Sequence, residues 1–167
     1  VNIYKMPYTS SRKDLVQLYK ARKSTDYSKL DTLVLKLQGG PYNALYVDIM
    51  KYPQYIFPAE TMSEYIFTFD RSTTINNKLI YVINFKQRTD IDTPLYTGQL
   101  FIDANNKVLT SAVFSLNITD KEKAARLFVR RKPMNADVWP TDVAYRVDYR
   151  EKNGKWYYSY SNVQMEF

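Results

Sequence analysis

The sequence predicts an α+β fold, with two N-terminal helices packed on a curved, mostly antiparallel β-sheet that is either open or a half-barrel. Three observations predict it: helical spacing of apolar residues before Gly39, alternating apolar and polar residues after it, and Asn- and Gly-rich turns between the alternating segments. A chain of 167 residues is long enough for one domain with its own core. We therefore expect residues 1–167 to form a single domain. Because the chain begins VNIYKM, we also expect it to be a mature or excised piece of a longer protein.

Two capping patterns predict the helices, over residues 11–24 and 28–38. Each segment begins with a serine that is followed three residues later by an aspartate, and apolar residues then recur at helical spacing. The pair Gly39-Gly40 supplies the end of the second helix. A strand through residues 33–37 is the alternative interpretation of the second segment.

Alternating apolar residues predict about seven antiparallel strands, paired in the order of the sequence. The first is expected over residues 42–53 and is closed by a proline. Three hairpins follow, with turns at residues 76–77, 103–107 and 153–154. These hairpins make up most of the predicted sheet.

Three local patterns refine the sheet. Gly98 inside a strand indicates a bulge, a bend or the close approach of another backbone. A change in the phase of the apolar residues indicates a β-bulge near Ser161. Thr119 and Glu122 form a capping box, which predicts a short helix between the second and third hairpins.

The composition excludes most common catalytic centres. The chain has no cysteine and no histidine, so disulfides, thiolate nucleophiles, Ser-His-Asp triads and histidine-based zinc sites are impossible. Asp90 and Asp92 have the spacing of some calcium ligands but are expected in a solvated loop. Asp48 is expected on the polar face of its strand, as a structural or surface acid. We therefore predict no catalytic residue, no metal site and no cofactor.

The charge is strongly basic, with a net value of +7. The densest basic block lies within residues 121–133, and its candidate anion patch consists of Arg126, Arg130, Arg131 and Lys132. The alternative is an ordinary solvated helix end. Basic residues on the strands alternate with apolar ones, as on any solvated face, so no nucleic-acid partner is expected. No stretch reaches the ~18 apolar residues of a membrane-spanning helix.

Aromatic side chains form the second candidate site. If the sheet is curved, its concave face could hold a lipid. In the alternative that we favour, the N-terminal helices cover these rings, which are then core. The candidate ligand-facing residues are Tyr65, Phe67, Phe69, Tyr81, Trp156, Tyr158 and Tyr160.

Several segments resemble a known family. YTGQLFIDANNKVLTSAVFSL and VAYRVDYREKNGKWYYSY, together with Gly39-Gly40, follow the order found in exported Gram-negative proteins labelled carboxypeptidase-like regulatory domain proteins. In those proteins a β-sandwich module precedes the region resembled here. The resemblance implies export to the periplasm or the outer-membrane surface, and no established reaction.

These observations lead to one functional expectation and two alternatives. We expect a non-enzymatic interaction or scaffold domain of the cell envelope, with an envelope protein or a lipid as its partner. The hairpin around GQLFID is similar in style to the half-barrels of periplasmic lipoprotein carriers, so one alternative is a carrier that binds lipid or lipoprotein on a concave aromatic face. The other alternative is a glycan-binding or glycan-hydrolysing domain. The sequence does not predict an oligomeric state.

Overall fold

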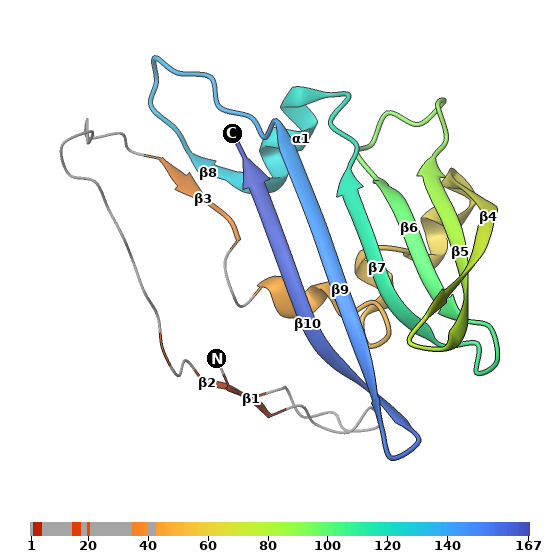
Figure 1. The fold of residues 1–167 in the computed structure, drawn as a ribbon. Coiled ribbons are helices and arrows are strands. Elements are labelled where there is room, and N and C mark those ends of the chain that lie inside the picture. The colour runs from red at the N-terminus through yellow and green to blue at the C-terminus, as the bar shows by residue number, and fades with distance from the viewer. Residues whose placement is uncertain (1, 5–14, 18–19, 21–34, 40–42) are drawn as a thin grey trace. The chain divides into compact units, whose positions relative to one another are not determined.

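The computed structural model describes residues 2–4, 15–17, 20, 35–39 and 43–167 (Figure 1). The chain divides into two compact units, residues 1–34 and 35–167, and the expectation of a single domain stays a prediction. In the first unit, strands β1 (Asn2–Tyr4) and β2 (Leu15–Gln17) pair antiparallel. The helix expected over 11–24 is therefore wrong at 15–17, because the capping pattern is local whereas β1 offers a backbone partner. The rest of that helix, except the non-helical Lys20, lies outside the described residues.

The second unit is built on one antiparallel sheet of six strands, in the order β10-β9-β7-β6-β5-β4. Its strands are β4 (Tyr65–Ile75), β5 (Lys78–Gln87), β6 (Tyr96–Asp103), β7 (Leu109–Leu116), β9 (Asp142–Lys152) and β10 (Lys155–Glu166). The sheet is open, with β4 and β10 at its edges, and it does not close into a barrel (Figure 1). The described fold is therefore mostly β, and the predicted antiparallel sheet is confirmed.

The three predicted hairpins are confirmed. Asn76 and Asn77 have φ angles of 49° and 61° between β4 and β5, and Asn153 and Gly154 have φ angles of 53° and 72° between β9 and β10. Two consecutive left-handed residues match the twist of the flanking strands. Between β6 and β7 the left-handed position is Lys107, with φ 55°. Local turn chemistry thus sets these three connections.

Register shifts bend the sheet at three places. They lie in β4 between Phe69 and Arg71, in β7 at Thr110, which is opposite the step from Phe101 to Ile102, and in β10 between Tyr158 and Tyr160. The last of these confirms the bulge expected near Ser161. Because a bulge bends its strand and increases its twist, the three together account for a curved sheet.

The small second sheet replaces part of a predicted helix. Strand β3 (Lys36–Leu37) pairs antiparallel with β8 (Val129–Arg131). Residues 35–39 contain no helix, so the helix expected over 28–38 is wrong there, and its remainder lies outside the described residues. The alternative interpretation as a strand is confirmed at Lys36–Leu37, where β8 supplies backbone partners.

The strand expected over 42–53 is also wrong. Its described residues form the 3-10 helix η2 (Asn43–Val47), followed by η3 (Pro53–Tyr55) and η4 (Ala59–Glu64). The alternating apolar residues point into the core from these short turns, which lie against one face of the sheet (Figure 1). Burial of that face, and not strand pairing, decides the conformation of this segment.

The main core lies between this helical segment and the sheet. It contains Val47 and Ile56 from the covering segment, and Phe85, Phe114 and Val147 from β5, β7 and β9. A smaller apolar cluster lies under helix α1 (Lys121–Phe128), where Ala124 packs with Leu116 and Val143. The predicted short helix is confirmed.

The cap of α1 differs from the expected one by a single position. Asp120, and not Thr119, is the N-cap, because its carboxylate accepts a hydrogen bond from the backbone N–H of Lys123 at 3.0 Å. Asp120 and Thr119 are both good capping residues, so the sequence pattern alone did not distinguish them.

Candidate functional site

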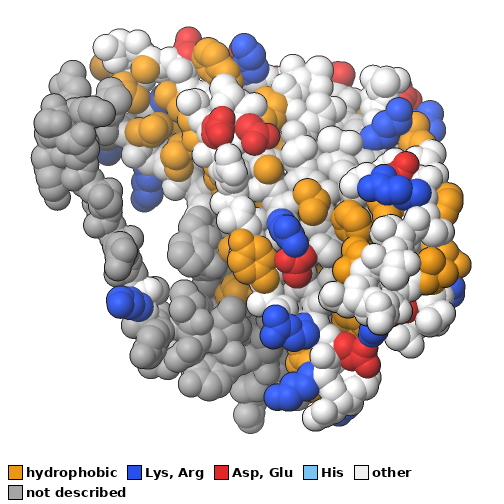
Figure 2. Space-filling model, viewed as in Figure 1, with side chains coloured by type: hydrophobic (Ala, Val, Ile, Leu, Met, Phe, Trp, Pro, Cys, Tyr) orange, Lys and Arg blue, Asp and Glu red, His pale blue; other side chains and the backbone are white. Residues whose placement is uncertain are grey.

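A groove lies on the sheet face opposite the main core, between the tips of the β4–β5 and β9–β10 hairpins. We call it the tip groove. Its volume is about 920 Å³, and its lining includes Lys78, Ser111, Arg146, Asp148, Arg150, Trp156 and Tyr160. Over strands β9 and β10, Figure 2 shows basic, acidic and hydrophobic side chains interspersed on this side of the molecule.

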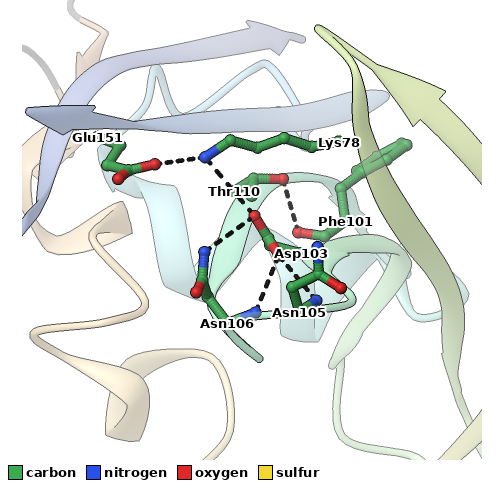
Figure 3. A network of polar contacts seen from close by, with 7 residues as sticks. All are labelled: Lys78, Phe101, Asp103, Asn105, Asn106, Thr110 and Glu151. Carbon is green, nitrogen blue, oxygen red and sulfur yellow. Dashed lines mark hydrogen bonds and ion pairs between the residues drawn. The ribbon is translucent and has the colours of Figure 1, made fainter. Parts of the chain in front are cut away.

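Lys78 joins the two hairpin tips. Its ammonium group forms an ion pair with Glu151 of β9 (Figure 3). The same group lies 5.0 Å from the centre of the Trp156 ring on β10. In the sheet, β6 and β7 separate β5 from β9. The ion pair therefore spans non-adjacent strands, which is the direct sign that the sheet curls around the tip groove. Hydrogen bonding to Glu151 raises the pKa of Lys78.

Behind Lys78, a buried carboxylate organises the β6–β7 turn (Figure 3). Asp103 Oδ1 accepts hydrogen bonds from the backbone N–H groups of Asn105 at 2.9 Å and Asn106 at 3.0 Å. Its Oδ2 lies 3.7 Å from Lys78 Nζ. The hydrogen bond from the Asn106 backbone, with smaller help from Asn105 and Lys78, lowers the pKa of Asp103. The carboxylate thus fixes the turn that supports Lys78.

We predict that Asp103→Asn lowers stability at neutral pH and flattens the acid dependence of unfolding. The folded pKa of Asp103 is lowered, so its contribution is full above the unfolded value of about 3.9 and is lost as the pH falls through the folded value. The stability difference between wild type and variant should therefore shrink below about pH 4. Urea unfolding at several pH values measures this, and a difference that does not change with pH would contradict it.

Part of the tip-groove lining is polar and hydrogen-bonded, and it lies beside the apolar side chains of Ile80, Phe101 and Val113. Asp148 Oδ2 lies 3.0 Å from Arg146 Nε, and Ser111 Oγ donates to Asp148 Oδ1 at 2.6 Å. Arg150 forms no ion pair with any described residue. The groove thus combines a hydrogen-bonded polar part, apolar side chains, an available guanidinium group and two aromatic walls.

The seven predicted aromatic residues do not share one surface. Tyr65 and Tyr158 face the main core, where their hydroxyls donate to the backbone oxygens of Ile56 at 3.0 Å and Ala44 at 3.2 Å. Burial raises the pKa of Tyr65 to about 12. Trp156 and Tyr160 line the tip groove. The remaining three are Phe67, which packs on Phe57 and Phe85, and Phe69 and Tyr81, which pack on each other.

Asp48 corrects a second expectation. The sequence places it on a polar strand face, but the structure buries it in the turn after η2. The Tyr149 hydroxyl donates to Asp48 Oδ1 at 3.1 Å and accepts from the Met50 backbone N–H at the same distance. Burial, and then the nearby carboxylate, raise the pKa of Tyr149. Asp48 is thus a structural acid that ties the covering segment to β9.

The four residues of the predicted anion patch come together in a second groove. Arg126 lies on α1, Arg130 and Arg131 lie on β8, and Lys132 follows directly. With Lys121, Glu122, Asp137 and Trp139 they line a groove of about 590 Å³, which we call the basic groove. It combines five basic residues with two acidic ones.

The described residues offer no metal site, since no group of three or more His, Cys, Asp or Glu side chains among them could hold an ion. In the loop after β5, Asp90 Oδ1 lies 3.2 Å from Arg88 Nε, and Asp92 Oδ2 lies 3.8 Å from Lys123 Nζ. None of the described helices has the length and apolar character needed to cross a membrane.

Sequence reasoning missed most of the tip groove. The alternating charges of Arg146, Asp148 and Arg150 marked a polar strand face, but nothing in the sequence brings that face near Lys78. The resemblance to the exported family stays a prediction, because comparisons with protein-family models, curated protein sequences and solved structures found no match.

Proposed function

We propose that this protein is a non-enzymatic interaction domain and that its tip groove holds an extended, polar segment of a partner protein. The observation that carries the proposal is the pairing of aromatic walls with the available guanidinium group of Arg150 in a groove of about 920 Å³. Ligand sites in proteins commonly have volumes of about 300–1,000 Å³. Aromatic residues and arginine are also the residue types that contribute most to protein recognition.

The charged part of the groove favours a polar ligand over an acyl chain. An acyl chain lying over Arg146, Asp148 and Lys78 would remove water from ion pairs without offering hydrogen bonds in return, and such desolvation is unfavourable. A peptide backbone or a polar side chain can replace that water. The lipid-carrier alternative therefore has less support at this groove than the peptide-binding proposal.

A glycan is the second candidate ligand, because of Trp156 and Tyr160. Sugar rings offer an apolar face for aromatic contact and hydroxyls for polar side chains, both of which this groove supplies. The envelope location implied by the family resemblance belongs to the same proposal, since exported partners include both proteins and glycans.

Selection of ligands by the domain tests the proposal. Wild-type protein is used to select binders from a random peptide library displayed on phage and, in parallel, from a glycan array. We expect peptide binders whose affinity falls at least about tenfold in Tyr160→Ala, because a hot-spot aromatic contributes about 2 kcal/mol or more. Binding of the selected peptides is measured by calorimetry.

Tyr157→Ala is the matched control. Tyr157 and Tyr160 lie on β10 with exposed fractions of 51% and 49%, but only Tyr160 lines the tip groove. The control should bind like wild type. Equal losses of affinity in both variants would contradict the proposal, as would selected peptides that bind Tyr160→Ala as tightly as wild type. Selection of glycans alone would favour the second candidate.

A further inference from the structure

The basic groove lies beside Met134, the most exposed large apolar side chain among the described residues of the second unit. The loop after β8 carries Met134, which is fully exposed. In the sequence Met134 follows Arg130, Arg131 and Lys132 within four positions. In Figure 1 this loop stands clear of the six-stranded sheet, next to β8 and α1. An exposed apolar tip and a basic cluster are therefore part of one surface.

The positive charge of this surface is only partly neutralised. Lys132 Nζ lies 2.5 Å from Asp137 Oδ1, and Lys121 Nζ lies 4.7 Å from the centre of the Trp139 ring. Arg126, Arg130 and Arg131 form no ion pair with any of the residues described in this unit, and all three are exposed. Three guanidinium groups thus remain available for an external anion.

We propose that this surface docks the domain on an anionic lipid bilayer, with lipid phosphates in the basic groove and Met134 inserted among the headgroups. Arginine pairs with phosphate through two parallel hydrogen bonds, and basic clusters attract anionic membranes. A bilayer fits this surface better than a soluble anion does, because a soluble anion gives a fully exposed methionine no apolar contact. The inference does not depend on the tip groove.

Two further features of the surface formed by the basic groove and Met134 suit it to a bilayer. The basic residues come from a helix, a strand and a loop, so their spacing is set by folded structure and not by a flexible tail. Trp139 lies in the same groove, and tryptophan favours the interface between lipid and water. The basic side chains, Trp139 and the exposed Met134 thus lie close together in the fold.

Vesicle sedimentation tests the proposal with the full chain. The probes are vesicles of phosphatidylglycerol and phosphatidylcholine in equal parts, and vesicles of phosphatidylcholine alone. We expect binding to the anionic vesicles only. Arg130→Glu/Arg131→Glu should lower the partition coefficient at least about 30-fold, because each basic residue near the surface contributes about fivefold.

A matched variant separates this surface from net charge. Lys152→Glu/Lys155→Glu changes the net charge by the same amount at exposed positions flanking the β9–β10 turn. It should keep most of the binding. Equal losses in the two double variants would overturn the proposal, as would equal binding to both kinds of vesicle.

Met134→Ser separates bilayer docking from capture of a soluble anion. Met134 is fully exposed, so the change should leave thermal unfolding as in wild type. It should weaken vesicle binding about fivefold at raised salt, where screened charges contribute less and apolar insertion remains. Unchanged binding by Met134→Ser, or binding abolished by soluble glycerol phosphate at the lipid-phosphate concentration, would overturn the bilayer as the occupant.

Discussion

Replacing Phe85 with alanine is expected to lower the free energy of unfolding by about 3–5 kcal/mol. The ring is 1% exposed and lies at the centre of the aromatic core, with the ring of Phe57 at 5.0 Å, Tyr65 at 6.0 Å and Phe114 at 6.3 Å between centroids. Its removal leaves a cavity between the covering segment and the sheet. Urea denaturation monitored by circular dichroism measures the loss.

Phe69→Ala is the control for this prediction. Phe69 lies on the neighbouring strand β4, but its ring is 61% exposed and contacts only the Tyr81 ring among the described aromatic side chains. The variant should lose less than about 1 kcal/mol, as expected for a surface position. If the two alanine variants lost equal stability, the assignment of Phe85 to the buried core and of Phe69 to the exposed margin of the same sheet face would be wrong.

The second large effect is expected at Gly98. A Cβ atom at this position would lie 2.2 Å from the backbone oxygen of Val113 and 2.5 Å from Cβ of Phe114. Two backbones must therefore move apart in the middle of the β6–β7 pair, and we expect Gly98→Ala to lower the free energy of unfolding by about 2–3 kcal/mol. Of the three alternatives that the sequence leaves open at Gly98, the close approach of another backbone is the one that is confirmed.

Gly154→Ala provides the comparison, because alanine there strains the backbone conformation without overlapping a neighbouring atom. Gly154 has a φ of 72°, and nothing lies within 4 Å of a Cβ placed there. Only the left-handed backbone is strained by alanine, which corresponds to about 1 kcal/mol. A larger loss at Gly154 than at Gly98 would show that turn geometry, and not close packing of β6 and β7, limits the stability of the sheet.

The hairpins could be predicted because their determinants are local. Residues 76–77 and 153–154 contain the Asn and Gly residues that left-handed turns favour, and the flanking alternation identifies the strands. The bulge in β10 left a phase change in the sequence. Each of these signals lies within a few residues of the feature that it predicts.

The segment 43–64 could not be predicted in the same way. Alternating Leu45, Val47 and Ile49 fit a strand, but the sheet needs a cover over its apolar face and this segment provides it. Asp48 was misplaced for the same reason, because its partner Tyr149 lies far away in the sequence. Non-local packing overrides local periodicity at these positions.

The two candidate sites also differ in how far apart their residues lie in the sequence. The basic groove uses Arg126, Arg130, Arg131 and Lys132, which are close in the sequence, so composition alone indicated a patch. The tip groove needs β5, β9 and β10 to meet through Lys78, Glu151 and Trp156. Only the curvature of the folded sheet brings those residues together, and a single sequence does not show it.

Hydrogen–deuterium exchange with a selected peptide bound tests the central claim, that the tip groove is the binding site, most directly. Binding should slow the exchange of backbone amides around Lys78 in β5, over 146–150 in β9 and around Tyr160 in β10. The amides of α1 and β8 should exchange as in the free protein. Protection confined to the exposed edge strand β4 or to the basic groove, with the tip groove unchanged, would contradict the claim.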